Sequence, residues 1–192
     1  MIRQARPEDA AEVVPILKQI LDDMEIPIFQ VISEDKFVEL VEKAFVLPDY
    51  RYSYQNILVE EVDGKIVSMM AGYPAEIEEN IDAPLFKLID EEGIDISQFD
   101  HMADTESWPG EWYIDSLAVH PLMHGKGYGK HMLEFLPDFV RAKGEKILSL
   151  NVDVNNESAQ KLYDKMGYKK VGELYIGSHL YNHMQLDLDN IN

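Results

Sequence analysis

The chain contains no cysteine among its 192 residues. It therefore has no disulfide framework, no thiolate nucleophile and no metal site built on cysteine. Long apolar runs are also missing, because no run reaches the ~18 residues that a membrane-spanning helix needs. The start, MIRQARPEDA, is polar and lacks the apolar stretch of a signal peptide. We therefore expect a cytoplasmic protein.

Basic residues are scarce, with 17 lysines and arginines against 36 acidic residues and a net charge of −19. Nucleic acids and anionic membranes would be repelled by this charge, so we expect neither as a partner, whereas a cationic substrate is permitted. Hydrophobic residues make up 46% of the chain, which excludes a disordered protein, and 192 residues suffice for one substantial core but not for two. We expect a single domain over residues 1–192 with an acidic insertion at about 76–107.

The most informative stretch is EWYIDSLAVHPLMHGKGYG, residues 111–129. An apolar strand pattern changes there into a turn with Gly125, Gly127 and Gly129, which opens an amphipathic helix. Glycine leaves backbone N–H groups uncovered, and the unpaired N–H groups of a helix start form an anion site for which phosphate is the natural ligand. Such turns also occur for steric reasons alone, so the turn by itself leaves both interpretations open.

Spacing excludes two other phosphate-binding motifs. A Walker A loop requires G-x-x-x-x-G-K-[ST], but His124 occupies the first glycine position and His131 follows Lys130. The Rossmann fingerprint requires G-x-G-x-x-G in an early βαβ unit, whereas these glycines alternate one by one and no such unit precedes them.

The stretch resembles instead the acetyl-CoA signature of the GNAT N-acetyltransferase superfamily, [QR]-x-x-G-x-[GA] after a strand that ends in L-x-V. The matching residues are HGKGYG at 124–129, preceded by Leu117-Ala118-Val119. A second block, NESAQKLYDKMGY at 156–168, is similar to the family pattern N-x-x-A-x-x-L-Y-x-x-x-G-[FY]. Two ordered blocks are far more specific than one. The resemblance is strong over 111–173, fair over 1–72 and absent over 76–107, and it departs from the family at His124, where arginine or glutamine is usual.

The remaining chain fits the α/β (α+β) fold that this resemblance implies: a mixed, mostly antiparallel sheet with one splayed parallel strand pair and flanking helices. Hydrophobic periodicity predicts strands at 2–5, 56–62, 65–72, 111–120, 146–154, 168–175 and 181–188. Asp63-Gly64 is a strong hairpin signal between the second and third of these. Helices are predicted from Pro7, after Ser33, from the glycine turn to Lys143 and over 157–166, with kinks at Pro15 and Pro137. The strand at 146–154 should run parallel to that at 111–120, because a helix connects them.

The insertion carries eleven acidic residues and one lysine, Lys87, with helical apolar spacing at Leu85, Phe86, Leu88 and Ile89. Charge runs usually face solvent, so a surface excursion with one short helix explains it. A lid over the acceptor site is the functional alternative, since long insertions in compact domains tend to be functional.

The resemblance implies acetyl-CoA as co-substrate, with pantetheine paired to a strand and the diphosphate on the glycine turn. It thereby implies cofactor-binding roles for Leu117, Ala118, Val119, His124, Gly125, Lys126, Gly127, Tyr128, Gly129, Lys130, Asn156 and Ser158. Main-chain N–H of Leu117 or Val119 is the expected oxyanion donor. His124 is only partly protonated at neutral pH, so Lys126 and Lys130 are expected to carry the phosphate charge. Asn156 just before a helix is equally an N-cap.

Acetyl transfer requires a base, because an amine of pKa ~10.4 is protonated at neutral pH and cannot attack. Asp115 and Glu111 are the candidates. They are an even number of residues apart from Leu117 and Val119, so we expect all four side chains on one face of the strand. Asp115 is preferred because it lies nearer the expected thioester, although either carboxylate could pair across the sheet or face solvent instead.

Tyr163 matches the tyrosine that in many members of the family donates a proton to the CoA thiolate; core packing is its structural alternative. The sequence thus predicts direct acetyl transfer from acetyl-CoA to a small amine or a peptide amine, with no metal. His179 and His183, four apart in a strand, are about 13 Å apart at ~3.3 Å per residue, too far to share an ion. A non-catalytic acyl-CoA-binding or sensor module is the alternative, a nucleotide-binding domain is a third interpretation, and the oligomeric state, a homodimer included, stays open.

Overall fold

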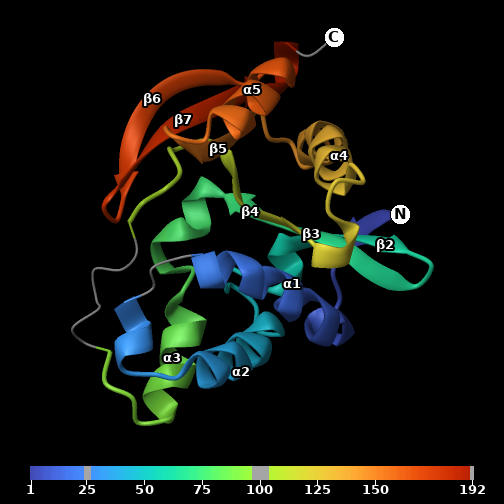
Figure 1. Cartoon of the computed structure of the whole chain (residues 1–192). Coiled ribbons are helices and arrows are strands. Elements are labelled where there is room, and N and C mark those ends of the chain that lie inside the picture. Colours follow the sequence, from blue (N-terminus) through green and yellow to red (C-terminus); the bar gives the residue numbers. More distant parts are fainter. Residues whose placement is uncertain (24–26, 97–103, 191–192) are drawn as a thin grey trace.

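The computed structural model describes residues 1–23, 27–96 and 104–190. Within them, seven strands form one sheet in the order β1-β2-β3-β4-β5-β7-β6 (Figure 1). All neighbouring strands pair antiparallel except β4 and β5, which are parallel. The strands are β1 Ile2–Gln4, β2 Ile57–Val62, β3 Lys65–Pro74, β4 Trp112–Val119, β5 Ile147–Asp153, β6 Lys169–Ile176 and β7 His179–Asp187. The predicted mixed sheet with a single parallel pair is therefore confirmed.

Helices cover both faces of this sheet (Figure 1). They are α1 Ala10–Asp23, α2 Glu34–Phe45, α3 Ala83–Glu91, α4 Tyr128–Ala142 and α5 Glu157–Lys165. Ser33 caps α2 by accepting a hydrogen bond from the Lys36 N–H, as its position before the helix predicted. The first helix differs slightly from expectation, because Pro7 begins a 3-10 turn, Pro7–Asp9, and α1 starts only at Ala10.

The β2–β3 hairpin has the tight turn that its sequence predicted. Asp63 and Gly64 both have positive φ, 51° and 74°, which is the backbone form that matches the right-handed twist of the two strands. Aspartate tolerates this region better than most residues and glycine adopts it freely.

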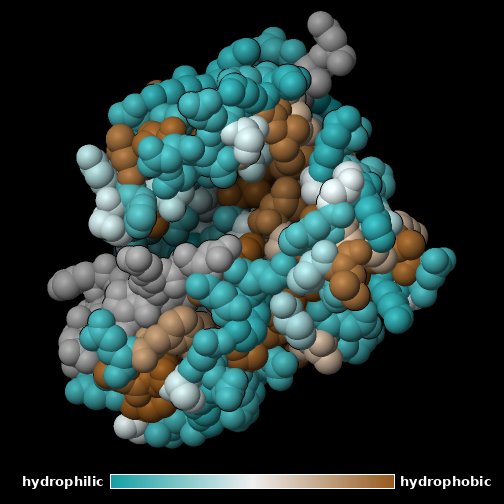
Figure 2. All heavy atoms as spheres, in the orientation of Figure 1, coloured by the Kyte–Doolittle hydropathy of each residue, from teal (hydrophilic) through white to brown (hydrophobic). Residues whose placement is uncertain are grey.

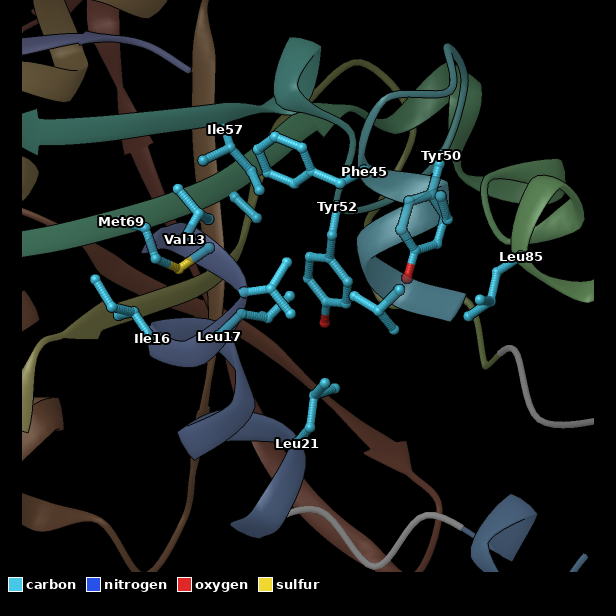
Figure 3. Packing of buried hydrophobic residues seen from close by; sticks show 14 of the residues in the cluster. Val13, Ile16, Leu17, Leu21, Phe45, Tyr50, Tyr52, Ile57, Met69 and Leu85 are labelled. Atoms are coloured by element: carbon cyan, nitrogen blue, oxygen red, sulfur yellow. The ribbon is translucent and has the colours of Figure 1, made fainter. Parts of the chain in front are cut away.

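Two hydrophobic clusters hold the helices to the sheet. The first lies between the sheet and α1 and α2, and Figure 3 shows Val13, Leu17 and Phe45 converging there on Ile57 and Met69. The second lies under α4 on the opposite face, and includes Met132, Leu136, Val140, Leu148, Leu150 and Met184. Each fully buried aliphatic side chain of this kind stabilises the fold by roughly 1.5–3 kcal/mol. The apolar stripes of α1 and α4 thus set the two layers on either side of the sheet.

The acidic segment joins β3 to β4. It begins with a 3-10 turn, Ala75–Asn80, and continues as α3, whose Leu85 and Ile89 are buried in the first cluster beside α2. The predicted short helix is therefore confirmed, and residues 97–103 of the segment lie outside the described residues. No helix in the described residues combines the length and apolar character needed to cross a membrane.

The parallel ladder between β4 and β5 is short. It joins Trp112, Tyr113 and Ile114 to Leu148, Ser149 and Leu150. β4 then continues to Val119 beside β3, and β5 continues to Asp153 beside β7. In the described part of the chain the two strands are no longer paired beyond Ile114 and Leu150, so they splay apart at their C-terminal ends. The edge of β4 that faces this wedge keeps main-chain groups free of the ladder.

Candidate active site

β4 contains a β-bulge at the mouth of the wedge. Ala71 of β3 pairs with Ser116 and Gly72 pairs with Ile114, so Asp115 is the extra residue of β4. Gly72 permits this, because a Cβ atom there would lie 2.1 Å from the ring of Trp112. The indole of Trp112 thus occupies the space that a side chain at position 72 would need.

The bulge overturns the expectation that Asp115 shares a face with Leu117 and Val119. Leu117 packs against the second cluster, and its side chain and that of Val119 reach Gly129 at the start of α4. Asp115 instead contacts Arg51 on the other face. The even spacing failed because a bulge inserts one residue and reverses the alternation beyond it.

A cavity of about 290 Å³ lies on the Asp115 face, where β4 and β5 separate. Asp115 and Asn151 directly follow the last paired residues of the two strands and both line the cavity. On this side of the molecule, Figure 2 shows a hollow between the part that carries β5, β6 and β7 and the part that carries α1, α2 and α3. The described residues that line it are Ile20, Leu21, Phe37, Tyr50, Arg51, Tyr52, Asp82, Leu85, Phe86, Glu106, Tyr113, Asp115, Ser116, Asn151, Ile176 and Tyr181.

Arg51 is the central charge of the cavity. Its Nη1 donates to Asp115 Oδ1 at 2.5 Å and to the Tyr73 hydroxyl at 2.8 Å, and its Nε and Nη2 donate to Asp82. Three carboxylates surround this one guanidinium, since Glu106 Oε1 lies 3.5 Å from Nη1. When all three are ionised the cavity carries an excess of negative charge, which suits a cationic ligand.

Both oxygens of the Asp115 carboxylate accept hydrogen bonds. Besides Arg51, the Tyr73 hydroxyl donates to Oδ1 at 3.2 Å and the Ser116 hydroxyl donates to Oδ2 at 2.7 Å. The side chain is 4% exposed. Of the two carboxylates expected to act as a base, Asp115 is thus the one at the cavity, and it is held there by three donors.

Glu111 lies outside the cavity lining, in a buried network of its own. His183 Nε2 lies 3.1 Å from its carboxylate, the Trp108 N–H donates at 3.0 Å, and Gln185 also donates. Burial raises the pKa of Glu111, but hydrogen bonds from His183 and the Trp108 main chain outweigh burial, so the pKa lies below its ordinary value. The structure therefore joins Glu111 to β7 and separates it from Asp115.

Glu106 is a carboxylate of the cavity that the sequence did not single out. The Tyr113 hydroxyl donates to its Oε2 at 2.7 Å, and Asn151 Nδ2 donates to its main-chain carbonyl at 2.9 Å. Burial, followed by the charge of Asp115, raises its pKa to about 7, although Arg51 and the Tyr113 hydrogen bond oppose the rise. Glu106 therefore changes its charge near neutral pH.

Glu78 fixes the chain at Glu106. Its Oε1 accepts from the Glu106 N–H at 2.8 Å, and its Oε2 accepts from the Ser107 N–H at 3.1 Å and the Ser107 hydroxyl at 2.5 Å. Glu78 belongs to the 3-10 turn that begins the acidic segment, and Glu106 lies near its end. The two ends of the segment are thereby joined at the cavity.

The glycine turn has the geometry of an anion site. Gly125 and Gly127 have φ of 73° and 88°, and Gly127 is the N-cap residue of α4. The first intrahelical bond runs from the His131 N–H to the Gly127 carbonyl, so the amides of Tyr128, Gly129 and Lys130 precede the helical ladder. The N-cap has no side chain to satisfy them.

Side chains around the turn are exposed. His124 Nε2 lies 2.8 Å from the Val119 carbonyl, which ties the turn to the end of β4. Lys126 contacts the sulfur of Met123, and Lys130 pairs with Glu134 on the outside of α4 at 3.2 Å. Lys130 belongs to α4, which lies on the face of the sheet opposite the cavity.

Tyr163 and Asn156 lie on the same side as α4. Tyr163 packs against the second hydrophobic cluster, edge-on to Tyr168 at 5.8 Å, and burial raises its pKa. Asn156 caps α5 by accepting from the Ala159 N–H at 3.1 Å, and the Ser158 hydroxyl donates to the same oxygen. The N-cap interpretation of Asn156 is confirmed, and its cofactor role stays a prediction. Tyr163 is not among the cavity residues.

Arg51 and Glu106 are among the cavity residues that sequence reasoning missed. Arg51 is one of only four arginines in the chain and stands in the run YRYSY, a dense polar-aromatic cluster that is itself a weak signal. Glu106 has no local signal that separates it from the other acids of its segment.

Known proteins resemble this chain in sequence and in fold. A model of the Acetyltransferase (GNAT) family matches residues 19–168. A solved structure described as an acetyltransferase is 39% identical, with a TM-score of 0.88 over 98% of this chain and 99% of that chain. The N-acetyltransferase of Staphylococcus aureus Mu50 is 30% identical, with a TM-score of 0.80 over 97% of this chain and 100% of that chain.

A curated relative matches over a shorter stretch. The ribosomal protein bS18-alanine N-acetyltransferase of Haemophilus ducreyi is 39% identical over 56 residues, which is 29% of this chain and 39% of that protein. The match thus spans about two fifths of the relative's length.

Proposed function

Because the chain belongs to the Acetyltransferase (GNAT) family, we propose that it is an N-acetyltransferase that moves an acetyl group from acetyl-CoA directly to a primary amine. Both substrates are bound together, and the amine attacks the thioester itself. A cysteine acetyl-enzyme is ruled out because the chain has no cysteine.

One observation carries this proposal: the free edge of β4 and the cavity meet at the same point of the sheet, beyond Ile114 and Leu150. Pantetheine that pairs with the main chain of Leu117–Val119 as an added strand has its thioester beside Asp115. The diphosphate then lies on the amides of Tyr128, Gly129 and Lys130, where the helix dipole favours negative charge.

Charge around the diphosphate comes from exposed side chains. Lys126 and Lys130 flank the amides and neutralise the phosphates, while His124 holds the turn against the Val119 carbonyl. Asn156 and Ser158, at the exposed start of α5, contact the cofactor through polar groups not used by the cap. These roles follow from the two family blocks that contain the residues.

The acetyl transfer needs an oxyanion donor and an acid. A main-chain N–H of Leu117 or Val119 on the free edge of β4 donates to the developing oxyanion, which requires no side chain. Tyr163 gives its phenolic proton to the departing thiolate. Its raised pKa keeps that proton on the ring at neutral pH, so the acid is present in the reactive form.

The acceptor is a small cationic amine with an apolar flank, or the first residue of a peptide. Asp82, Glu106 and Asp115 outnumber Arg51, so an ammonium group balances the cavity. Phe37, Leu85 and Phe86 supply an apolar wall. A volume of about 290 Å³ lies at the small end of ligand sites, which favours a small acceptor group. An amino-terminal alanine, the group named for the Haemophilus ducreyi relative, is a second candidate of suitable size.

The test combines acetyl-CoA binding with turnover. Calorimetry measures acetyl-CoA affinity, and a thiol assay with mass spectrometry follows CoA release and acetylation across small alkyl amines, diamines and peptides that begin with alanine. Amine-dependent CoA release supports the proposal. Tight acetyl-CoA binding with no release on any amine indicates a non-catalytic acyl-CoA sensor, and competition by ATP or NAD but not by CoA indicates a nucleotide-binding domain.

A further inference from the structure

Within the proposed function, on which this step rests, we propose that Glu106 is the general base that removes the proton from the acceptor ammonium. Glu106 belongs to the acidic segment between β3 and β4, and the segment thereby supplies a reacting group to the cavity. Asp115 then serves to hold Arg51 and the ammonium, and Glu111 serves to join β4 to β7.

Toward the residues that the structure describes, the carboxylate of Glu106 has one oxygen committed to a hydrogen bond and one available. Oε2 accepts from the Tyr113 hydroxyl at 2.7 Å. Oε1 lies 3.5 Å from Arg51 Nη1, too far for a good hydrogen bond, and the side chain is 19% exposed at the cavity. An ammonium in the cavity can therefore donate to Oε1 without breaking a hydrogen bond from any described residue.

The charges around Glu106 make it a better base than an ordinary glutamate. Arg51 faces it with positive charge, while Asp115 and Glu78 face it with negative charge. Among the described residues, the other titratable groups that line or border the cavity are Asp82, Tyr50, Tyr52, Tyr73, Tyr113 and Tyr181. Burial and the negative neighbours outweigh Arg51 and raise the pKa of Glu106 from 4.5 to about 7, which makes its carboxylate a stronger base than an ordinary glutamate. About half of the molecules are then ionised at neutral pH, ready to accept a proton.

Neither alternative carboxylate has this combination. Asp115 accepts hydrogen bonds from Arg51, Tyr73 and Ser116, so both of its oxygens are engaged. Glu111 lies outside the cavity lining, bonds to His183, and has a lowered pKa, which makes it a weaker base. Glu106 alone of the three joins cavity exposure to an available oxygen.

Protons and electron pairs balance across the reaction. The ammonium gives one proton to Glu106, which passes it to water, and the nitrogen lone pair forms the C–N bond to the thioester carbonyl carbon. The C–S bond then breaks, and sulfur leaves with the electron pair. The thiolate takes a proton from Tyr163, while the second nitrogen proton is lost to water and Tyr163 is reprotonated from water. The products are the amide, CoA and one proton.

Glu78 is a positioning residue in this scheme. It holds the N–H groups of Glu106 and Ser107 and touches neither the cavity nor a substrate. Asn151 holds the Glu106 carbonyl from β5, at the residue that follows the end of the parallel ladder. The main chain at Glu106 is thus fixed to the 3-10 turn after β3 and to β5.

The experiment compares the full-length chain with Glu106→Gln, Glu106→Asp and Asp115→Asn, with Glu91→Gln as the matched control. Glu91 is an exposed acid of the same segment, on α3. Each variant is measured for acetyl-CoA affinity by calorimetry and for kcat/KM from pH 5 to 9 on one amine that the wild type acetylates. Two further amines of different pKa separate the titration of the enzyme from that of the acceptor.

We expect wild-type kcat/KM to rise with pH and level off above about 7, because the ionised carboxylate is the active form. Glu106→Gln should lower kcat/KM by about 10²- to 10⁴-fold and remove this rise, while acetyl-CoA affinity stays within about twofold. Glu106→Asp should recover part of the rate and the pH limb, and Glu91→Gln should match the wild type.

A Glu106→Gln variant that binds acetyl-CoA normally and keeps the wild-type rate and pH limb overturns the inference. If Asp115→Asn loses the rise of kcat/KM with pH and Glu106→Gln keeps it, Asp115 is the base instead. If the wild type binds acetyl-CoA and acetylates no amine, the proposed function fails and this step with it. That result is visible before any variant is made.

Discussion

Arg51 and Asp115 are 64 residues apart in the chain, and their side chains meet with Arg51 Nη1 2.5 Å from Asp115 Oδ1. The two side chains are only 9% and 4% exposed. A buried charge that loses its partner is strongly destabilising, typically by about 3–5 kcal/mol. We therefore expect Arg51→Met to lower the free energy of unfolding by about that amount at pH 8, measured by urea denaturation.

The loss should be smaller at pH 5. Arg51 holds down the pKa of Glu106, so its removal raises that pKa above 7 and leaves the protonated form dominant at pH 5. A carboxyl group whose pKa is higher in the folded state makes the protein less stable as pH rises toward that folded-state pKa. The loss of stability caused by Arg51→Met is therefore largest at alkaline pH. Lys43→Met removes an exposed ion pair with Glu39 and should leave the stability almost unchanged at either pH. An equal penalty at both values would contradict this account.

Gly127→Ala should weaken acetyl-CoA binding through the backbone alone. Gly127 has φ of 88° and a Cβ atom added there would meet nothing within 4 Å, so the cost is conformational and amounts to about 1–2 kcal/mol. Relaxation out of this conformation misdirects the amides of the first turn of α4, and we expect the Kd measured by calorimetry to rise about tenfold, which is ~1.4 kcal/mol.

Gly64→Ala is the matched control for this glycine. Gly64 also has positive φ, 74°, and open space around it, but it lies in the β2–β3 hairpin. The two variants should lose similar stability while only Gly127→Ala loses affinity. If both variants bind acetyl-CoA with the same affinity, the turn at Gly127 does not bind the cofactor.

Tyr163→Phe should lower kcat about 10- to 100-fold with acetyl-CoA affinity unchanged, because the phenol gives its proton only as the thiolate leaves. The ring packs against the second hydrophobic cluster and phenylalanine preserves that packing, so the melting temperature should stay close to that of the wild type. Tyr175→Phe, at a tyrosine 66% exposed on β6, is the control and should leave kcat unaltered. If Tyr163→Phe has the kcat of the wild type, Tyr163 serves only in packing and is not the acid.

Glu106→Gln should make the protein more stable at pH 8. The pKa of Glu106 is raised from 4.5 to about 7, so folding favours its protonated form and wild-type stability falls as pH rises from about 4.5 to 7. The difference corresponds to about 3 kcal/mol at 1.36 kcal/mol per pKa unit. At pH 4.5 the free energies of unfolding of Glu106→Gln and the wild type should be equal, and at pH 8 the variant should be more stable by about 3 kcal/mol. Glu91→Gln should match the wild type at both pH values. A variant no more stable than the wild type at pH 8 would mean that Glu106 titrates normally.

Local spacing predicted most of the elements. The stripes Val13 to Leu21 on α1 and Met132 to Val140 on α4 give helices because their period is close to 3.6, and Asp63-Gly64 gives a hairpin because both residues accept positive φ. The parallel pairing of β4 and β5 followed from the helix that connects them. These signals lie within a few residues of one another in the sequence.

The cavity was not predictable in the same way. The face on which Asp115 lies depends on a bulge set by the β3–β4 register and by the Trp112 ring over Gly72, which come from distant parts of the chain. Glu106 reaches the cavity only because Glu78 and Asn151 hold its main chain. The carboxylate expected from the sequence and the one with the raised pKa differ for this reason.

The chain has two tryptophans, and their positions provide an optical reporter of the site. Trp108 is two residues beyond Glu106 and its indole stacks on His183 with ring centroids 4.2 Å apart, whereas Trp112 is buried in the cluster beneath α4. An amine that fills the cavity perturbs the segment that carries Trp108 and leaves Trp112 in the same surroundings. Intrinsic fluorescence can therefore register acceptor binding without a label, and Trp108→Phe should silence the response.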